Sequence, residues 1–187
     1  MLNEGHFSAP RSTELEMIGD RTVGEVLDEA EASGAITYVK PRSKLRREDE
    51  GSRDLFAHAA LYQAGWRDFS VLDERNARNT QAEEWAQYKK SIDLVRMNGE
   101  YWEVKSPPPG KNPDSTRAVE RGFRRAEDQF VGHPVAHGQP RRIVFNGRYL
   151  KASDTKNATR IAKEMRLQGI DEVVQVKKDG TTEHFVL

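Results

Sequence analysis

The pattern of apolar and polar positions divides this chain into alternating helices and short strands. Apolar residues that recur every three or four positions predict amphipathic helices over 23–31, 51–64, 115–130 and 157–168. Short runs rich in β-branched and aromatic residues predict strands over 66–72, 142–145, 172–176 and 182–186. With a strand hairpin over 91–105, this order predicts an α/β fold in which helices flank a central mixed β-sheet.

Turn-forming residues mark where several of these elements begin and end. Asp20-Arg21-Thr22 can cap the first helix, and Gly65 and Gly169 follow the ends of two others. A turn is expected at 178–180, loops at 76–81 and 132–140, and a short helical turn at 82–88.

The register of the hairpin over 91–105 decides which side chains share a face. A two-residue turn at Asn98-Gly99 would put Asp93 opposite Val104, and the acidic residues on opposite faces. A three-residue loop over 97–99, with Gly99 in the left-handed conformation, puts Asp93 opposite Glu103. Apolar segregation fixes the register of half-buried strands, and the second register gathers on one face Ile92, Leu94, Trp102 and Val104. We therefore expect the three-residue loop.

In that register Asp93, Glu103 and Lys105 converge on the polar face of the hairpin. Carboxylate oxygens are hard ligands that suit Mg²⁺ or Mn²⁺, and a lysine ammonium can polarise an attacking water or a phosphate. The constellation predicts metal-assisted cleavage of a phosphodiester. The alternative is an ordinary exposed hairpin with a cross-strand Glu-Lys pattern.

Composition limits the remaining possibilities. The chain has 187 residues, 32% of them charged, and no net charge, so nucleic-acid binding would have to use a local basic patch. There is no cysteine, which excludes disulfides and thiolate metal sites. No apolar run approaches the roughly 18 residues of a membrane span, and the N-terminus does not read as a signal peptide. The length suggests an N-terminal helical or linker appendage over 1–45 and a main domain over 46–187.

Four motifs together resemble a known nuclease group. They are the helix end at 64–66, Asp93 before the Asn-Gly turn, the run 102–107 (Trp-Glu-Val-Lys-Ser-Pro), and Arg125-Ala126-x-x-Gln129. Over about 50–187 the chain resembles the PD-(D/E)xK nuclease superfamily, and more narrowly the C-terminal tRNase domain of CdiA-type contact-dependent growth-inhibition toxins. The resemblance implies a metal-dependent RNase that cuts tRNA in the cytoplasm of a target bacterium. It also implies delivery as the C-terminal part of a secreted or phage-borne protein, and a cognate immunity protein.

The resemblance also assigns roles to residues. Asp93 and Glu103, with the carbonyl of Val104, would hold Mg²⁺ or Mn²⁺, and Lys105 would orient or deprotonate the water. The family usually carries a Glu eleven residues before the glycine that ends the preceding helix, where this chain has Asp54. Glu50, one turn earlier, could substitute for it. Asp54 could instead be a carboxylate that meets the helix dipole.

The helix over 115–130 carries the candidate substrate-binding residues. Four arginines lie along one helix face, a basic residue precedes them, and a glutamine follows one turn later: Arg117, Arg121, Arg124, Arg125, Lys111 and Gln129. The alternative is a solvated face, because Glu120, Glu127 and Asp128 dilute the charge. His133 and His137 do not predict a zinc site, since Pro134 and Gly138 argue against the helix that their spacing needs.

Two rival functions remain open from the sequence. A DNA endonuclease of the phage, restriction or repair kind could use the same site, since a fold does not fix its substrate. The domain could also be a non-catalytic docking module of a larger phage or secretion protein. In that case the structure is expected to hold Asp93, Glu103 and Lys105 apart.

Overall fold

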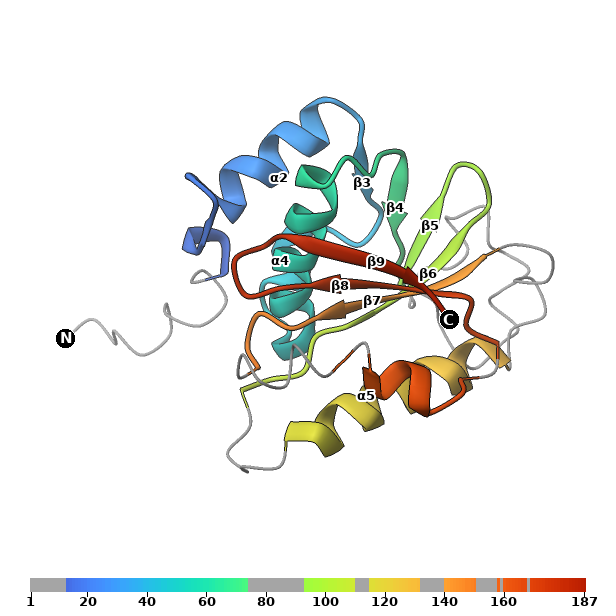
Figure 1. Cartoon of the computed structure of the whole chain (residues 1–187). Coiled ribbons are helices and arrows are strands. Elements are labelled where there is room, and N and C mark those ends of the chain that lie inside the picture. The colour runs from blue at the N-terminus through green and yellow to red at the C-terminus, as the bar shows by residue number, and fades with distance from the viewer. Residues whose placement is uncertain are drawn as a thin grey trace.

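A seven-stranded mixed sheet forms the centre of the computed structural model, which describes residues 13–73, 93–109, 115–131, 140–150, 158, 160–167 and 169–187 (Figure 1). The order of the strands in the sheet is their order in the chain: β3 (Ile36–Tyr38), β4 (Phe69–Val71), β5 (Leu94–Arg96), β6 (Tyr101–Lys105), β7 (Arg141–Asn146), β8 (Glu172–Val176) and β9 (Thr182–Val186). Pairs β3–β4, β6–β7 and β7–β8 are parallel, and the other three are antiparallel. The predicted α/β fold with a central mixed sheet is confirmed.

Helices cover both faces of this sheet. They are α2 (Val23–Ala32), the short α3 (Arg42–Leu45), α4 (Asp49–Gln63) and α5 (Ser115–Val131), and Ala158 and 160–164 are also helical. Thr22 caps α2 as expected, because its Oγ1 accepts a hydrogen bond from the Glu25 N–H at 3.2 Å. Gly65 and Gly180 have φ angles of +98° and +88°, which fits the predicted helix end and turn.

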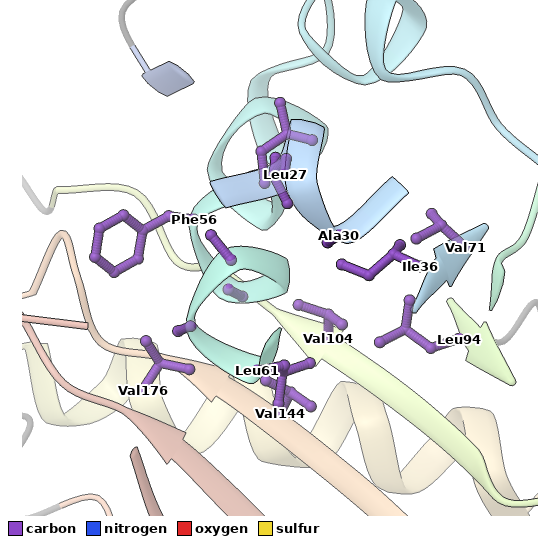
Figure 2. Close-up of a cluster of buried hydrophobic side chains, with 14 of the residues drawn as sticks. Leu27, Ala30, Ile36, Phe56, Leu61, Val71, Leu94, Val104, Val144 and Val176 are labelled. Atoms are coloured by element: carbon purple, nitrogen blue, oxygen red, sulfur yellow. The ribbon is translucent and has the colours of Figure 1, made fainter. Parts of the chain in front are cut away.

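Two hydrophobic clusters lie on opposite faces of the sheet, because side chains alternate along each strand. Val104, Val144 and Val176 pack with α2 and α4 in the first cluster (Figure 2). Ile143 and Phe145, one position away on β7, pack with α5 and the helical residues after 158 in the second. Figure 1 shows α4 and α5 on either side of the sheet. The strand β6 is therefore covered on both faces.

Helix α4 is buried on more sides than its sequence predicts. The expected apolar stripe is Leu55, Ala59 and Tyr62 with Phe56, yet Ala57, His58, Ala60 and Leu61 are buried as well. The reason is tertiary, since α4 contacts α2 in addition to β6 and β7. Buried polar residues on α4 consequently acquire close neighbours that a single amphipathic face would not give them.

Residues 13–45 share a sheet and a core with the residues that follow them. Strand β3 pairs with β4, and the apolar side of α2 lies in the first cluster. The small β1 (Met17–Ile18) and β2 (Arg21–Thr22) pair with each other, and Ile18 is fully buried against the β8–β9 turn. The boundary expected between the appendage and the main domain thus runs through one sheet and one core.

Some expectations concern residues outside the described ranges. They are the loop over 76–81, the helical turn over 82–88, Ile92, Lys111, and the loop over 132–140 except its last residue, with His133 and His137 in it. The strand expected over 66–72 is shorter, at Phe69–Val71.

Candidate active site

The hairpin β5–β6 has the three-residue loop that its hydrophobic pattern predicts. Leu94 pairs with Trp102 and Val95 with Tyr101, while the Arg96 N–H donates to the Glu100 carbonyl at 3.0 Å. Gly99 has a φ of +88° and donates its N–H to the Arg96 carbonyl at 2.9 Å. Leu94 and Trp102 are fully buried, so the apolar face of the hairpin fixes the register as expected.

Asp93 is held in place from both neighbouring strands. Its backbone carbonyl accepts the Leu72 N–H at 2.9 Å, just beyond β4. Its Oδ2 accepts the Val104 N–H of β6, also at 2.9 Å. The Asp93 carboxylate therefore accepts a hydrogen bond from the backbone of β6, and this bond restricts the side chain to one rotamer. Val104 itself lies in the first hydrophobic cluster through its side chain.

Glu103 and Lys105 form an ion pair in the interior, next to Asp93. The Glu103 side chain is 1% exposed, and its Oε1 lies 2.9 Å from the Lys105 Nζ. Its other oxygen, Oε2, is buried and has no hydrogen-bond donor among the described residues. A buried carboxylate oxygen without a donor is costly, so this atom marks a place where a ligand would restore a lost interaction.

Asp54 brings a third carboxylate to the same place from α4. It is nearly fully buried, and its Oδ1, like Oε2 of Glu103, lacks a donor among the residues described. It lies beyond the first turn of α4, where a helix dipole has lost most of its effect, whereas Asp49 and Glu50 occupy that turn. The geometry therefore favours a role of Asp54 in the site over a helix-dipole role.

The electrostatics of the cluster follow from this crowding. Burial, and then the negative charge of Asp93, raise the pKa of both Asp54 and Glu103 well above their ordinary values. Burial alone would lower the pKa of Lys105, but the carboxylates of Glu103 and Asp93 outweigh it and raise that pKa. Lys105 stays an ammonium, and the crowding of three carboxyl groups beside it favours the uptake of a proton or a cation.

These groups line one cavity of about 150 Å³ beside the end of the hairpin. Asp93, Glu103 and Lys105 enter it from the strands, and α4 contributes to it Glu50, Gly51, Asp54 and His58. The four residues predicted to be catalytic, Asp54, Asp93, Glu103 and Lys105, thus line one cavity. Glu50, the alternative to Asp54, lines it as well.

His58 is a lining residue that the sequence analysis did not predict. Its Nδ1 is 2.9 Å from the hydroxyl of Tyr38 on β3, and burial lowers its pKa to about 3. The one sequence signal was its spacing, because four residues after Asp54 on a helix is the same face. The imidazole is therefore neutral at ordinary pH and links β3 to the wall of the cavity.

The donor chemistry of the cavity fits a hard divalent cation. No three His, Cys, Asp or Glu side chains within the described ranges are already arranged as a metal-binding group. The cavity nevertheless holds two buried carboxylate oxygens without donors, on Asp54 and Glu103, beside a third carboxylate on Asp93. Mg²⁺ is commonly bound by one or two carboxylates while it keeps several waters, so this set is sufficient for it.

The predicted arginine face of α5 divides into two groups. Arg121 and Arg125 line a second cavity of about 270 Å³, next to the first. Arg124 points to another partner, since its Nη1 lies 2.9 Å from Glu127, and Arg117 is exposed. The side chain of Gln129 lies outside the part of the chain that the structure describes.

Comparison of the chain with protein-family models, curated proteins and solved structures gave no match. Within the described residues, none of the helices has the length and apolar character needed to cross a membrane. Function must therefore be argued from the site.

Proposed function

We propose that this protein is a metal-dependent endonuclease that hydrolyses phosphodiester bonds in nucleic acid. The observation that carries the proposal is the convergence of Asp54, Asp93, Glu103 and Lys105 on one cavity, with two carboxylate oxygens left without donors. A docking module with a decayed site has no need for such a costly arrangement. The PD-(D/E)xK resemblance of the same residues points in the same direction.

Each residue has a distinct role in the proposed reaction. A bound Mg²⁺ or Mn²⁺ would lower the pKa of a water and stabilise charge that develops on the phosphate. Asp93 and Glu103, with the Val104 carbonyl as the third proposed ligand, would hold it. Asp93 is preorganised for this because its Oδ2 is fixed by the Val104 N–H. Reorganisation during the reaction would be correspondingly small.

Lys105 is the electrophilic partner in this proposal. Its ammonium is adjacent to Glu103, and it lines both the cavity of the carboxylates and the neighbouring basic cavity. It can hold the attacking water or a non-bridging phosphate oxygen between the two. Asp54 would accept a hydrogen bond from the same water or help to hold the cation.

Among nucleic acids, tRNA is the substrate that we propose first. The basis is the resemblance to CdiA-type tRNase domains, which would also place the activity in a bacterial cytoplasm and pair the protein with an immunity protein. A DNA endonuclease would use the same carboxylates and lysine. The substrate panel described next distinguishes these two possibilities.

The test is a cleavage assay on total bacterial tRNA and on plasmid DNA. Each substrate is incubated with Mg²⁺, with Mn²⁺ and with chelator, using the native chain, Glu103→Gln and Glu164→Gln. Glu164 is an exposed residue that pairs only with Arg160 among the residues described, so it is the matched control.

Discrete tRNA fragments that need both the cation and Glu103, but not Glu164, would support the tRNase. Plasmid nicking alone would keep the site and move the activity to DNA. Cleavage that survives chelator would contradict the mechanism, because metal-independent RNases use the 2′-OH with acid and base residues. No cleavage of either substrate would contradict the nuclease proposal.

A further inference from the structure

A basic groove opens beside the carboxylate cavity, between α4, α5 and the segment that follows β6. Its volume is about 270 Å³, and its walls carry three arginines, Arg53, Arg121 and Arg125, with the single carboxylate of Glu50. Lys105 and Glu50 line this groove and the carboxylate cavity alike. The two spaces are therefore adjacent, and they share Lys105 and Glu50 in their walls.

Arg53 is fixed in this groove by bonds that its sequence position does not predict. Its Nε donates to the Ser106 carbonyl at 2.7 Å. The side chain of Asn146, which is fully buried on β7, donates to the Arg53 carbonyl at 3.0 Å and to the Ser106 hydroxyl at 3.1 Å. The backbone of Arg53 and one edge of its guanidinium are thus anchored to the sheet, and the guanidinium is preorganised.

Arg121 and Arg125 face the groove from α5 and are available for a ligand. They are four residues apart on one helix face and exposed, and neither forms an ion pair with any described residue. Gly122, between them, also lines the groove. A Cβ at Gly122 would lie 3.3 Å from Phe145 Cε2 and 3.9 Å from Lys105 Cβ, so α5 lies directly against the sheet at this point. The absence of a side chain there lets the helix that carries both arginines pack closely against β6 and β7.

We propose that this groove binds a backbone phosphate of the nucleic acid, next to the phosphate that is cut over Lys105. Guanidinium groups bind phosphate oxygens in a bidentate manner, and three of them beside the one carboxylate of Glu50 leave excess positive charge for an anionic phosphodiester. The position relative to the cut rests on the proposed nuclease function. The binding of a phosphate in the groove itself rests on the arginines. Arg53 would bind the phosphate directly, from the α4 wall of the groove.

Binding of tRNA to a chain that cannot cut it tests the groove directly. The Glu103→Gln chain is titrated with fluorescently labelled total bacterial tRNA in chelator, by anisotropy, over a series of salt concentrations. Arg121→Ala and Arg125→Ala are added singly to that background. Arg124→Ala is the matched control, because it removes the same charge from the same helix outside the groove.

We expect Arg121→Ala and Arg125→Ala each to weaken binding about five- to tenfold and to reduce the slope of log K against log[salt] by roughly 0.7–0.9, the value for one lost phosphate contact. Arg124→Ala should change affinity less than about twofold. Arg53→Lys keeps the charge but loses the planar fork, and should weaken binding about threefold or more. Thermal melting of each variant verifies its fold.

Two outcomes would overturn the proposal that this groove binds phosphate. Equal weakening by Arg124→Ala and Arg121→Ala would indicate general attraction to the helix. Unchanged affinity in all groove variants would place the substrate elsewhere.

The experiment also separates this proposal from the proposed function. Suppose that the native chain cuts nothing, but its affinity for tRNA depends on Arg121 and Arg125 and not on Arg124. The nuclease proposal is then wrong, and the proposal that the groove binds phosphate is supported. If the native chain cuts tRNA with the expected dependence on metal and Glu103, while the groove variants bind and cut normally, the groove fails and the nuclease stands.

Discussion

The buried imidazole of His58 predicts a specific acid sensitivity of the fold. His58 is 1% exposed, bonds to the Tyr38 hydroxyl, and has a pKa of about 3 because burial disfavours its charged form. In the unfolded chain its pKa returns to about 6.5. The perturbation that isolates this effect is His58→Gln, which keeps a polar group that can bond to Tyr38 and removes the titration.

The sign of the effect follows from the two pKa values. Between pH 6.5 and 3 the unfolded state binds a proton at this position and the folded state does not, so the free energy of unfolding falls as pH falls. One pKa unit corresponds to about 1.4 kcal/mol, and pH 5 lies about 1.5 units below the unfolded value. The titration of His58 should therefore lower the free energy of unfolding by about 2 kcal/mol when the pH falls from 7.5 to 5.

Urea denaturation at a series of pH values measures this contribution as the difference between the native chain and His58→Gln. The carboxyls of Asp54 and Glu103 share the cavity and have raised pKa values, which favour stability at lower pH. Their effect is present in both chains and cancels in the difference. Tyr38→Phe is the control, because it removes the hydrogen bond at a cost of about 1 kcal/mol at every pH but keeps the titration.

A pH-independent difference between the native chain and His58→Gln would refute the reasoning, since it would mean that the imidazole titrates normally in the folded protein. Loss of the pH dependence in Tyr38→Phe would refute it in another way, because it would attribute the shift to the hydroxyl rather than to burial.

Three further predictions concern the cation, the unpartnered carboxylate and the N-terminal segment. Mg²⁺ at about 100 times its dissociation constant should stabilise the native chain by about 2.7 kcal/mol in thermal melts. This gain in stability should vanish in Asp93→Asn, and an equal gain in that variant would exclude a cation site at Asp93. Asp54→Asn should raise the free energy of unfolding in urea, measured without metal, by about 1 kcal/mol, because its amide can donate to the neighbouring carboxylates. The same variant should lower cleavage. A loss of stability would contradict the conclusion that Oδ1 of Asp54 has no donor. Gly180→Ala should destabilise by more than about 2 kcal/mol, because φ is +88° and its Cβ would meet Ile18 Cγ1. A melt within a degree of the native value would show that Ile18 does not pack there.

The hairpin was the part of the site that local sequence rules could predict. The register depended on Gly99 and on which residues are apolar, and both are properties of adjacent positions. The ends of α4 and α5 were predicted to within about two residues for the same reason. Convergence of Asp93, Glu103 and Lys105 followed from the register alone.

Other parts of the site depend on contacts between distant segments. Strand β3 is only three residues long, and the core position of Ile36 depends on its pairing with Phe69. His58 and Arg53 both lie on a helix whose burial is set by α2 and the sheet together. No residue spacing within 49–63 predicts the hydrogen bond from Arg53 to Ser106, which is 53 residues away. Residues of this kind are recognised only after the tertiary structure is known.

The agreement between strand order and chain order has a consequence for how the protein folds. Each strand of the seven-stranded sheet pairs with the one that immediately precedes it in that sheet, so no strand has to be inserted between two that have already paired. The sheet can grow by adding one strand at a time from β3 onward. The residues of the carboxylate cavity all precede position 106, whereas α5 and the last three strands come later. We therefore expect the residues of the carboxylate cavity to come together first during folding, and the basic groove to be completed only when α5 packs against the sheet.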